Sequence, residues 1–368
     1  MRDFRERAYD LAIFIPAMLL LGAGLVMVFS ASQMQALSDF GDMFYYIKRQ
    51  VVWVILGVSV MYVAMKLRLD NARKLAVPLF VAALASLAAV LAVGKTVGGA
   101  KRWIDIGIGT LQPSEFAKPL MVFVLAWYYD FIEKQGKSDF LYTVAVPMVF
   151  AVSAAGLVLL EPDFSTAGLF VVLALAIVFT STKYKASLLV LGAPAVIGAF
   201  AWAVQEPYRW RRITGFLNPW SDARSSGYQI VQTLYALGSG GIKGLGLGLS
   251  RQKMYYIPEQ HTDFIFAVVG EELGLIGTTS FAALYLIIAI RGLRIANQTE
   301  DTFKSTLAYG LSMWIALQAF INMGVVANLL PVTGMTLPLV SAGGSSMLPT
   351  MAAVGLLLNI SRDAAYRR

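Results

Sequence analysis

Long apolar stretches separated by short polar ones set the pattern of this chain. We count ten of them, each near the ~20 residues that a helix needs to cross a bilayer. A spanning helix satisfies its own backbone hydrogen bonds, so this pattern predicts an all-α integral membrane protein, a polytopic bundle of ten transmembrane helices. The predicted spans are residues 9–30, 50–66, 74–94, 113–131, 141–160, 165–181, 187–205, 264–290, 305–326 and 345–361.

The longest stretch outside these spans, residues 206–263, joins the seventh and eighth spans. We expect it to be a large extracytoplasmic loop within a single transmembrane domain that covers residues 1–368. Apolar positions at helical spacing between Tyr228 and Leu237 predict a helix along the membrane surface. The glycine-dense segment 238–248 lacks the strand and the lysine-serine ending of a nucleotide loop, so we interpret it as turns rather than a phosphate site.

Positive charge is unevenly distributed between the two sides of the predicted bundle. With a cytoplasmic N-terminus, more than half of the 30 Lys and Arg residues fall on that side. Cytoplasmic loops carry such an excess, and an even number of spans places both termini inside. The same bias accounts for the net charge of +8 without nucleic-acid binding. Arg2, Arg5 and Arg7 precede an apolar stretch that is too long for a cleavable signal, so we expect a first span there.

The composition of the chain narrows its chemistry. The chain is 58% hydrophobic and 14% charged, and it has no cysteine and a single histidine. Disulfides, thiolate metal sites, cysteine nucleophiles and multi-histidine zinc sites are therefore excluded. Any metal would be a hard divalent cation such as Mg²⁺ or Mn²⁺ held by oxygen ligands, and we expect no organic cofactor.

The single histidine and an acid, His261 and Asp263, stand together at the start of the eighth span. A carboxylate beside hydrocarbon is costly to desolvate, so it either has a partner or faces a water-filled cavity in which it does chemistry. Asp263 is therefore the leading catalytic candidate, with capping of the following helix as the alternative. His261 is a candidate titrating partner rather than a catalyst. Glu271, two turns deeper, either forms structural hydrogen bonds or lines a polar path.

A second polar cluster opens the fourth span. Glu115 and Lys118 are three residues apart and lie on one helix face. They form either an ion pair that lowers the cost of burying both charges, or a site where Lys118 meets an anionic substrate and Glu115 holds it in place. Just upstream, the run Lys101-Arg102-Trp103 either binds phosphate or anchors the chain at the membrane interface.

Polar or small residues also flank other spans. Glu161 and Asp163 lie in a very short turn between the fifth and sixth spans. They could coordinate a divalent cation, but we favour solvated side chains. Segments 330–334 and 341–346, which flank the tenth span, are rich in small residues. They indicate either close helix approach or a re-entrant loop that lines a cavity.

Short motifs are spread over nearly the whole chain. They are Lys101-Arg102-Trp103, Gln112-Pro113-Ser114-Glu115, Asn218-Pro219-Trp220, Ser226-Gly227-Tyr228-Gln229, Pro258 to Ala267, Gly270 to Gly274, Leu330 to Gly334 and Gly343 to Ser346. With these motifs the chain resembles the SEDS family (shape, elongation, division and sporulation), the FtsW/RodA-type peptidoglycan polymerases. Segments 246–253 and 270–272 are more similar to the FtsW branch than to the RodA branch. Ala342 departs from the tyrosine that is common in the family, which affects packing there.

The resemblance implies a peptidoglycan glycosyltransferase that polymerises lipid II, the undecaprenyl-diphosphate-linked disaccharide-pentapeptide, in cell division or cell elongation. It also implies ten transmembrane helices in the bacterial plasma (inner) membrane and a class B penicillin-binding protein as transpeptidase partner. The family's essential outer-loop aspartate corresponds to Asp263, and its span-four glutamate and lysine correspond to Glu115 and Lys118. Arg102 and Glu271 match further positions of the family's polar cavity.

Residues and resemblance together give a mechanistic hypothesis. Asp263 takes the proton of the attacking sugar hydroxyl, while Lys118, Arg102 and a divalent cation stabilise the departing diphosphate. Two other functions stay open. Internal prolines and buried acids would suit a transporter, such as a flippase for lipid II, and a non-catalytic scaffold for the penicillin-binding protein would need no chemistry at all. An ion channel fits less well, because no span carries a regular polar stripe.

Overall fold

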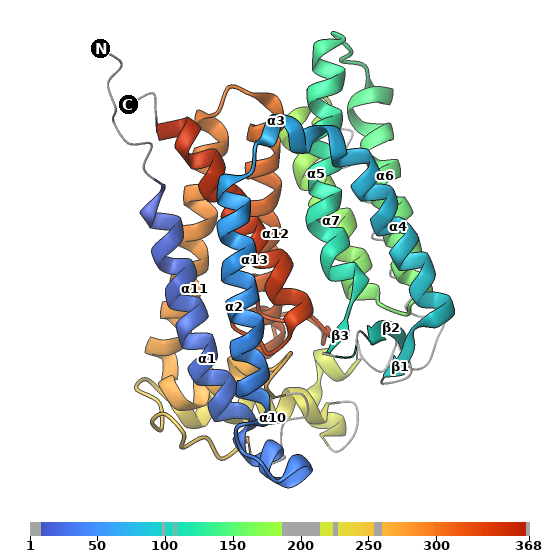
Figure 1. The fold of residues 1–368 in the computed structure, drawn as a ribbon. Coiled ribbons are helices and arrows are strands. Elements are labelled where there is room, and N and C mark those ends of the chain that lie inside the picture. Colours follow the sequence, from blue (N-terminus) through green and yellow to red (C-terminus); the bar gives the residue numbers. More distant parts are fainter. Residues whose placement is uncertain are drawn as a thin grey trace, which may run out of the picture.

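Nine long helices that run between two ends of the molecule form most of the described part of the computed structural model (Figure 1). The structure describes residues 9–97, 100–105, 107, 109–185, 214–223, 227–253 and 260–365. Within these residues the long helices are α1 (Leu11–Phe40), α2 (Tyr45–Lys66), α4 (Ala76–Val93), α5 (Pro113–Lys134), α6 (Val146–Leu160), α7 (Phe164–Ser181), α11 (Ile265–Gln298), α12 (Thr302–Val326) and α13 (Gly344–Ala365). Shorter elements are α3 (Leu69–Ala72), η1 (Arg73–Leu75), the π-helical η2 (Leu141–Ala145), η3 (Pro219–Asp222) and α10 (Tyr228–Gly240).

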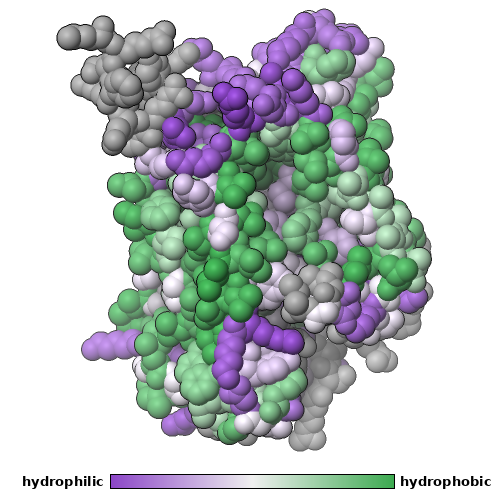
Figure 2. Space-filling model, viewed as in Figure 1, coloured by the Kyte–Doolittle hydropathy of each residue, from purple (hydrophilic) through white to green (hydrophobic). Residues whose placement is uncertain are grey.

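An apolar belt surrounds the bundle. Among the described residues, eight helical segments are long and apolar enough to cross a membrane. Helix α5 matches them in length but carries Glu115, Lys118 and Asp130 on its inner faces. Figure 2 shows hydrophobic side chains over the middle of the molecule and hydrophilic ones gathered at its two ends. This arrangement is that of a multi-pass membrane protein.

Nine of the ten predicted spans correspond to these helices, and the seventh, residues 187–205, lies outside the described residues. Two helices extend furthest beyond their predicted ends. Helix α1 continues to Phe40, where Gly41 ends it in the left-handed conformation (φ 69°), and α11 continues past Arg291 to Gln298. The ends of the predicted spans were placed where the apolar stretch stops, whereas a helix continues until a capping residue ends it.

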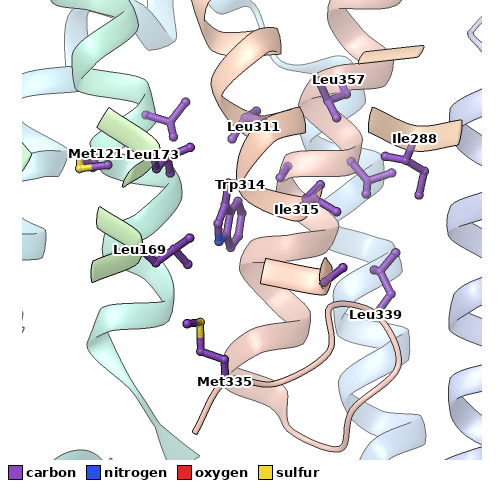
Figure 3. Close-up of a cluster of buried hydrophobic side chains, with 14 of the residues drawn as sticks. Met121, Leu169, Leu173, Ile288, Leu311, Trp314, Ile315, Met335, Leu339 and Leu357 are labelled. Carbon is purple, nitrogen blue, oxygen red and sulfur yellow. The ribbon is translucent and has the colours of Figure 1, made fainter. Parts of the chain in front are cut away.

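The helices form two groups that meet at α12. Helices α1, α2, α11 and α13 pack on one another on one side, and α4, α5, α6 and α7 on the other (Figure 1). Helix α12 contacts α11, α5 and α7, and Trp314 at its centre is fully buried between Leu169 of α7 and Ile315 of its own helix (Figure 3). Gly310 permits this close approach, because an added Cβ would lie 2.4 Å from Val122 Cγ1 of α5.

A small antiparallel sheet between α4 and α5 was missed by the all-α prediction. Its strands are β1 (Lys95–Val97), β2 (Ala100–Asp105) and β3 (Thr110–Leu111), in the order β1-β2-β3. Strands of two to six residues are too short for a clear alternation of apolar and polar positions, so the sequence pattern did not reveal them. The sheet presents Arg102, in the middle of β2, to the turn between α6 and α7.

The first and last described helices begin and end at the same end of the bundle. The Asp10 amide donates to Ser361 Oγ (3.2 Å), and Arg291 near the end of α11 pairs with Asp10. At this end a cavity of ≈ 660 Å³ is lined by residues of α5, α7, α11 and α12, including Ser181. Helix α11 begins at the opposite end, so the chain passes from one end of the bundle to the other between Ser181 and Ile265.

Helix α10 confirms the helix predicted for residues 228–237. It packs on α11 at the end opposite the chain termini, where Figure 1 shows it lying across the bundle. The glycine-dense segment after it forms turns, as predicted, and Gly241, Gly244, Gly246 and Gly248 all have positive φ. Three of the motif residues, Ser226, Pro258 and Glu259, lie outside the described residues.

Candidate active site

Asp263 lies immediately before α11, at the end of the bundle opposite the termini, and is half-buried. The N-cap position of α11 is occupied by Phe264, whose side chain makes no capping hydrogen bond, and Asp263 precedes it by one residue. The alternative that Asp263 caps the amides of α11 stays a prediction. Asp263 Oδ2 lies 3.5 Å from the point at which Gly334 would carry a Cβ. The carboxylate therefore sits against the α12–α13 loop, residues 327–343.

The α12–α13 loop and its neighbours hold the backbone that carries Asp263. Three consecutive carbonyls in front of α11 each accept a hydrogen bond from this region. The donors are the Ala342 amide to His261 O (2.9 Å), Ser341 Oγ to Thr262 O (2.6 Å) and Asn322 Nδ2 to Asp263 O (2.7 Å). The small residues predicted to permit close approach or to form a re-entrant loop thus position the candidate base.

Glu115 and Lys118 form the buried ion pair that was one of the two predicted alternatives. Lys118 Nζ lies 2.7 Å from Glu115 Oε1, and the exposed fractions of the two side chains are 0% and 8%. Lys118 Nζ also donates to Gln318 Oε1 of α12 at 2.7 Å. An ammonium carries three N–H donors, so one remains. Glu115 Oε2 is buried without a hydrogen-bond partner and is the unused acceptor of the pair.

A polar stripe on α12 reaches both candidate groups. Trp314, Gln318 and Asn322 follow one another at intervals of four residues and lie on one helix face. The Trp314 indole and Lys118 both donate to Gln318 Oε1, and Gln318 Nε2 donates to Thr336 O (3.1 Å). This stripe was not predicted from the sequence, although three polar groups at this spacing in an apolar helix are a detectable signal.

Arg102 is anchored to the turn between α6 and α7. Its Nε donates to Glu161 O (3.1 Å), one terminal nitrogen donates to Pro162 O (2.8 Å), and the other lies 3.5 Å from Asp163 Oδ2. Its side chain remains 27% exposed. The prediction that Arg102 contacts the diphosphate stays a prediction, since its present partners are all protein groups.

The acids of this turn are not solvated, so the interpretation that we favoured is wrong. Glu161 is fully buried and neither of its carboxyl oxygens has a hydrogen-bond partner. Asp163 is also buried and caps α7 by accepting from the Thr166 amide (3.1 Å). Burial and the neighbouring Asp163 carboxylate raise the pKa of Glu161 to about 8, although Arg102 opposes them. The Glu161 carboxyl is therefore largely protonated at neutral pH.

His261 and Glu271 are both buried and contact other protein groups. The His261 ring is buried 4.6 Å from the ring of Tyr46. Glu271 is 1% exposed, and its Oε1 accepts from the Arg251 amide (2.9 Å) while its Oε2 accepts from the Ser250 hydroxyl. The structure therefore favours the hydrogen-bonded alternative for Glu271, and a contact of either residue with substrate stays untested.

The neighbouring Glu272 completes a buried ion pair beside Glu271. Lys253 Nζ lies 3.2 Å from Glu272 Oε1, with both side chains at most 2% exposed, and Ser30 Oγ of α1 donates to the same oxygen (2.6 Å). Just beyond, Gly274 interrupts α11 with φ 65° and ψ −161°. Segment 241–253 is thereby fixed to α11 by side chains and backbone together.

A divalent cation would find few protein ligands in this region. Across the described ranges, no three acidic or histidine side chains come together as a metal site. Asp263 offers one carboxylate beside a glycine, whereas Mg²⁺ prefers six oxygen ligands. These residues fit a cation that is held mainly by substrate oxygens and water, as in other phosphate-bound magnesium sites.

Comparison with known proteins places the chain in a family. The model of the FtsW/RodA/SpoVE cell cycle proteins matches residues 10–366. The chain belongs to this family. It is 44% identical over 360 residues to the "Probable peptidoglycan glycosyltransferase FtsW" of Thioalkalivibrio sulfidiphilus, covering 96% of this chain and 90% of the relative. It is 41% identical to "Stage V sporulation protein E" of Bacillus subtilis, covering 98% and 99% of the two chains.

Solved structures of family members share the fold. One chain comes from the study "Structural coordination of polymerization and crosslinking by a peptidoglycan synthase complex", with a TM-score of 0.81, 28% identity, and 98% and 99% of the two chains covered. Another is the rod shape determining protein RodA of Thermus thermophilus, with a TM-score of 0.72, 28% identity and 97% of each chain covered. A further structure of that RodA is of a variant in which one aspartate is replaced by alanine. The predicted resemblance to SEDS proteins is confirmed.

Proposed function

We propose that this chain is a peptidoglycan glycosyltransferase that polymerises lipid II into glycan strands, with Asp263 as its general base. The observation that carries the proposal is the placement of the Asp263 carboxylate, half-buried against Gly334, on a backbone whose carbonyls are held at three successive residues. Relatives that cover nearly the whole chain bear the name of this activity, which supports the same reaction here.

The reaction needs a base and a stabilised leaving group. The hydroxyl of an acceptor sugar attacks the anomeric carbon of the lipid-linked strand, the bond to the diphosphate breaks, and the hydroxyl proton passes to the Asp263 carboxylate. The donor linkage is alpha and the product linkage is beta, so a single inverting displacement accounts for both. General-base assistance contributes ~10²–10⁴-fold, which sets the scale of loss expected for Asp263→Asn.

Cations near the leaving group complete the proposed mechanism. Lys118, held by Glu115, supplies a positive charge beneath the outer end of α5, and the partly exposed Arg102 supplies a second one at the neighbouring turn. Lys118 is sealed from solvent here, so its charge would act on the diphosphate from within the protein. A divalent cation bound to the diphosphate would supply further charge.

The membrane topology of the proposal has ten spans and both termini in the cytoplasm of a bacterium. The described helices provide nine crossings, and the chain changes ends between Ser181 and Ile265, which supports a further crossing by the predicted span 187–205. The 206–263 loop and Asp263 then lie outside the inner membrane, within one domain of residues 1–368. This is the side where lipid II would be polymerised and where a class B penicillin-binding protein would join as transpeptidase.

The test is a polymerisation assay with purified lipid II. We expect wild-type protein, alone or with a penicillin-binding partner, to form glycan strands and Asp263→Asn to lose at least about 10²-fold in rate. Asp42→Asn is the matched control, since it neutralises an exposed acid in the α1–α2 loop at the same end of the bundle. Normal strand synthesis by Asp263→Asn would refute the base assignment.

The same preparation separates the two rival functions. Scrambling of labelled lipid II across vesicle membranes, without polymer formation, would favour a flippase or another transporter. Unchanged synthesis by an intact complex of Asp263→Asn with the penicillin-binding protein would favour a scaffold.

A further inference from the structure

We propose that Gln318 and Asn322 are positioning residues that hold Lys118 and Asp263 at a fixed separation through the α12–α13 loop. The inference deepens the proposed function and rests on it, because it takes Asp263 as the base. Both side chains are buried, with exposed fractions of 0% for Gln318 and 2% for Asn322. They act through other residues rather than by contact with substrate.

Asn322 binds the backbone of Asp263 directly. Its Nδ2 donates to Asp263 O and to Met335 O, each at 2.7 Å. Two carbonyl acceptors at this distance identify the nitrogen of the amide, because its oxygen would repel both. Only Asn or Gln carries an uncharged NH₂ group with two donors, so one side chain fixes the base and the loop beside it.

Gln318 performs the corresponding task for Lys118. Its Oε1 accepts from Lys118 Nζ (2.7 Å) and from the Trp314 indole (2.9 Å), while its Nε2 donates to Thr336 O (3.1 Å). The ammonium is thus held between Glu115 and Gln318, and the second end of the same amide is attached to the loop.

The two amides converge on adjacent loop residues. Asn322 binds Met335 O and Gln318 binds Thr336 O, and the preceding residue, Gly334, borders Asp263 Oδ2. Gln318 and Asn322 are four residues apart, about 6 Å along the axis of α12. One helix turn and three loop residues therefore set the separation of the proposed base from the proposed leaving-group cation.

Ordinary helix packing does not require these residues. Most of the buried side chains of α12 are apolar, and Leu or Met would fill the same volume without the cost of burying an amide. The cost of burying the two amides is offset because they donate to loop and Asp263 carbonyls and Gln318 accepts from Lys118 and Trp314, while Asn322 Oδ1 has no hydrogen-bond partner. A shift of about 1 Å in a reacting group can cost ~10²-fold in rate, so such anchors are expected at a catalytic site.

The experiment measures kcat, KM for lipid II and the thermal midpoint of purified variants. For Asn322→Ala we expect kcat to fall at least about tenfold, with KM changed less than about threefold, because Asp263 loses its anchor while substrate contacts remain. Gln318→Glu keeps the acceptor for Lys118 and Trp314 but removes the donor to Thr336. For this variant too we expect kcat to fall at least about tenfold while KM changes less than about threefold. Ser312→Ala is the control, a buried hydroxyl of α12 whose hydrogen bond stays within the helix, to Ala308 O.

The outcomes separate this inference from the proposed function. Wild-type kcat in Asn322→Ala beside an inactive Asp263→Asn would overturn the positioning role alone, whereas an active Asp263→Asn would overturn the base assignment itself. If kcat, lipid II affinity and the thermal midpoint all fall together in these variants, the two residues have a purely structural role. That outcome would also overturn the inference. If Asn322→Ala does not fold, Gln318→Glu decides the matter, since it retains the buried Lys118 contact.

Discussion

Lys118 Nζ lies 2.7 Å from Glu115 Oε1 inside a helix that crosses the hydrophobic belt, and both groups are almost fully screened from solvent. Removal of one partner of such a pair leaves an uncompensated buried charge, which typically costs about 3–5 kcal/mol. We therefore expect Lys118→Met to lower the thermal midpoint strongly in detergent.

The double variant separates stability from activity at this pair. Lys118→Met with Glu115→Gln removes both charges, and replacement of a whole buried pair is often neutral for stability. We expect the double variant to recover most of the thermal midpoint but not lipid II polymerisation, since the cation for the diphosphate is gone. Recovery of both would assign the pair to structure alone.

Glu161 makes stability depend on pH. Its pKa is raised to about 8 in the folded protein from an ordinary value of 4.5, so the folded state keeps a proton that the unfolded state has lost. Stability is then fully present below about pH 4.5 and falls as the pH rises towards 8, by about 1.4 kcal/mol per unit at most. Glu161→Gln should abolish this slope and raise the thermal midpoint at pH 7.5.

Asp105→Asn is the matched control for that measurement. Asp105 lies on β2 and is exposed, and its hydrogen bond to Lys95 lowers its pKa, with help from the Gly107 amide. Because the pKa of Asp105 is lowered on folding, its contribution to stability is lost only when the pH falls below the ordinary pKa of an aspartate, 3.8. The thermal midpoint of Asp105→Asn should therefore change with pH between 5 and 8 as it does in the wild type. A wild-type thermal midpoint that does not change over this pH range would contradict the role given to Glu161.

Glu271 provides a test between substrate contact and structural anchoring. Its oxygens accept hydrogen bonds from the 250–252 segment, so Glu271→Gln turns an NH₂ group towards those donors. We expect a loss of about 1–3 kcal/mol in stability, with kcat/KM of the folded enzyme nearly unchanged. A selective rise in KM at unchanged thermal midpoint would instead restore the predicted role in substrate binding.

Gly274 is required by the interruption of α11. At φ 65° a side chain is strained, and an added Cβ would lie 2.3 Å from Gly244 N and 2.6 Å from Ile242 O. We expect Gly274→Ala to destabilise the protein by several kcal/mol or to prevent folding. Gly22→Ala in α1 is the comparison, because an added Cβ there has no atom within 4 Å and should be neutral or slightly stabilising.

The sequence predicted the helices well because hydrocarbon crossing imposes a length and a composition that can be read directly. Asp263 was identified for a related reason, since an acid beside a long apolar stretch needs an explanation. Gln318 and Asn322 were missed because their importance depends on which loop folds back against α12, and spacing along one chain does not contain that information. The burial of Glu161 was misjudged similarly, because a short polar turn is usually solvated unless a separate element covers it, as β2 does here.

Because of the interruption at Gly274, most backbone amides of α11 donate within the helix, but two of them donate to another segment of the chain. The amides of Leu275 and Ile276 donate to Gly241 O (2.8 Å) and Ile242 O (3.2 Å) of a distant segment, and the carbonyls of Glu271 and Glu272 accept from Leu245 and Gly246 in return. Deuterium uptake at residues 275 and 276 should therefore follow the detachment of segment 241–246 rather than fraying of the helix. Two positions in the middle of a long helix thus become internal reporters of how firmly segment 241–246 is held on α11.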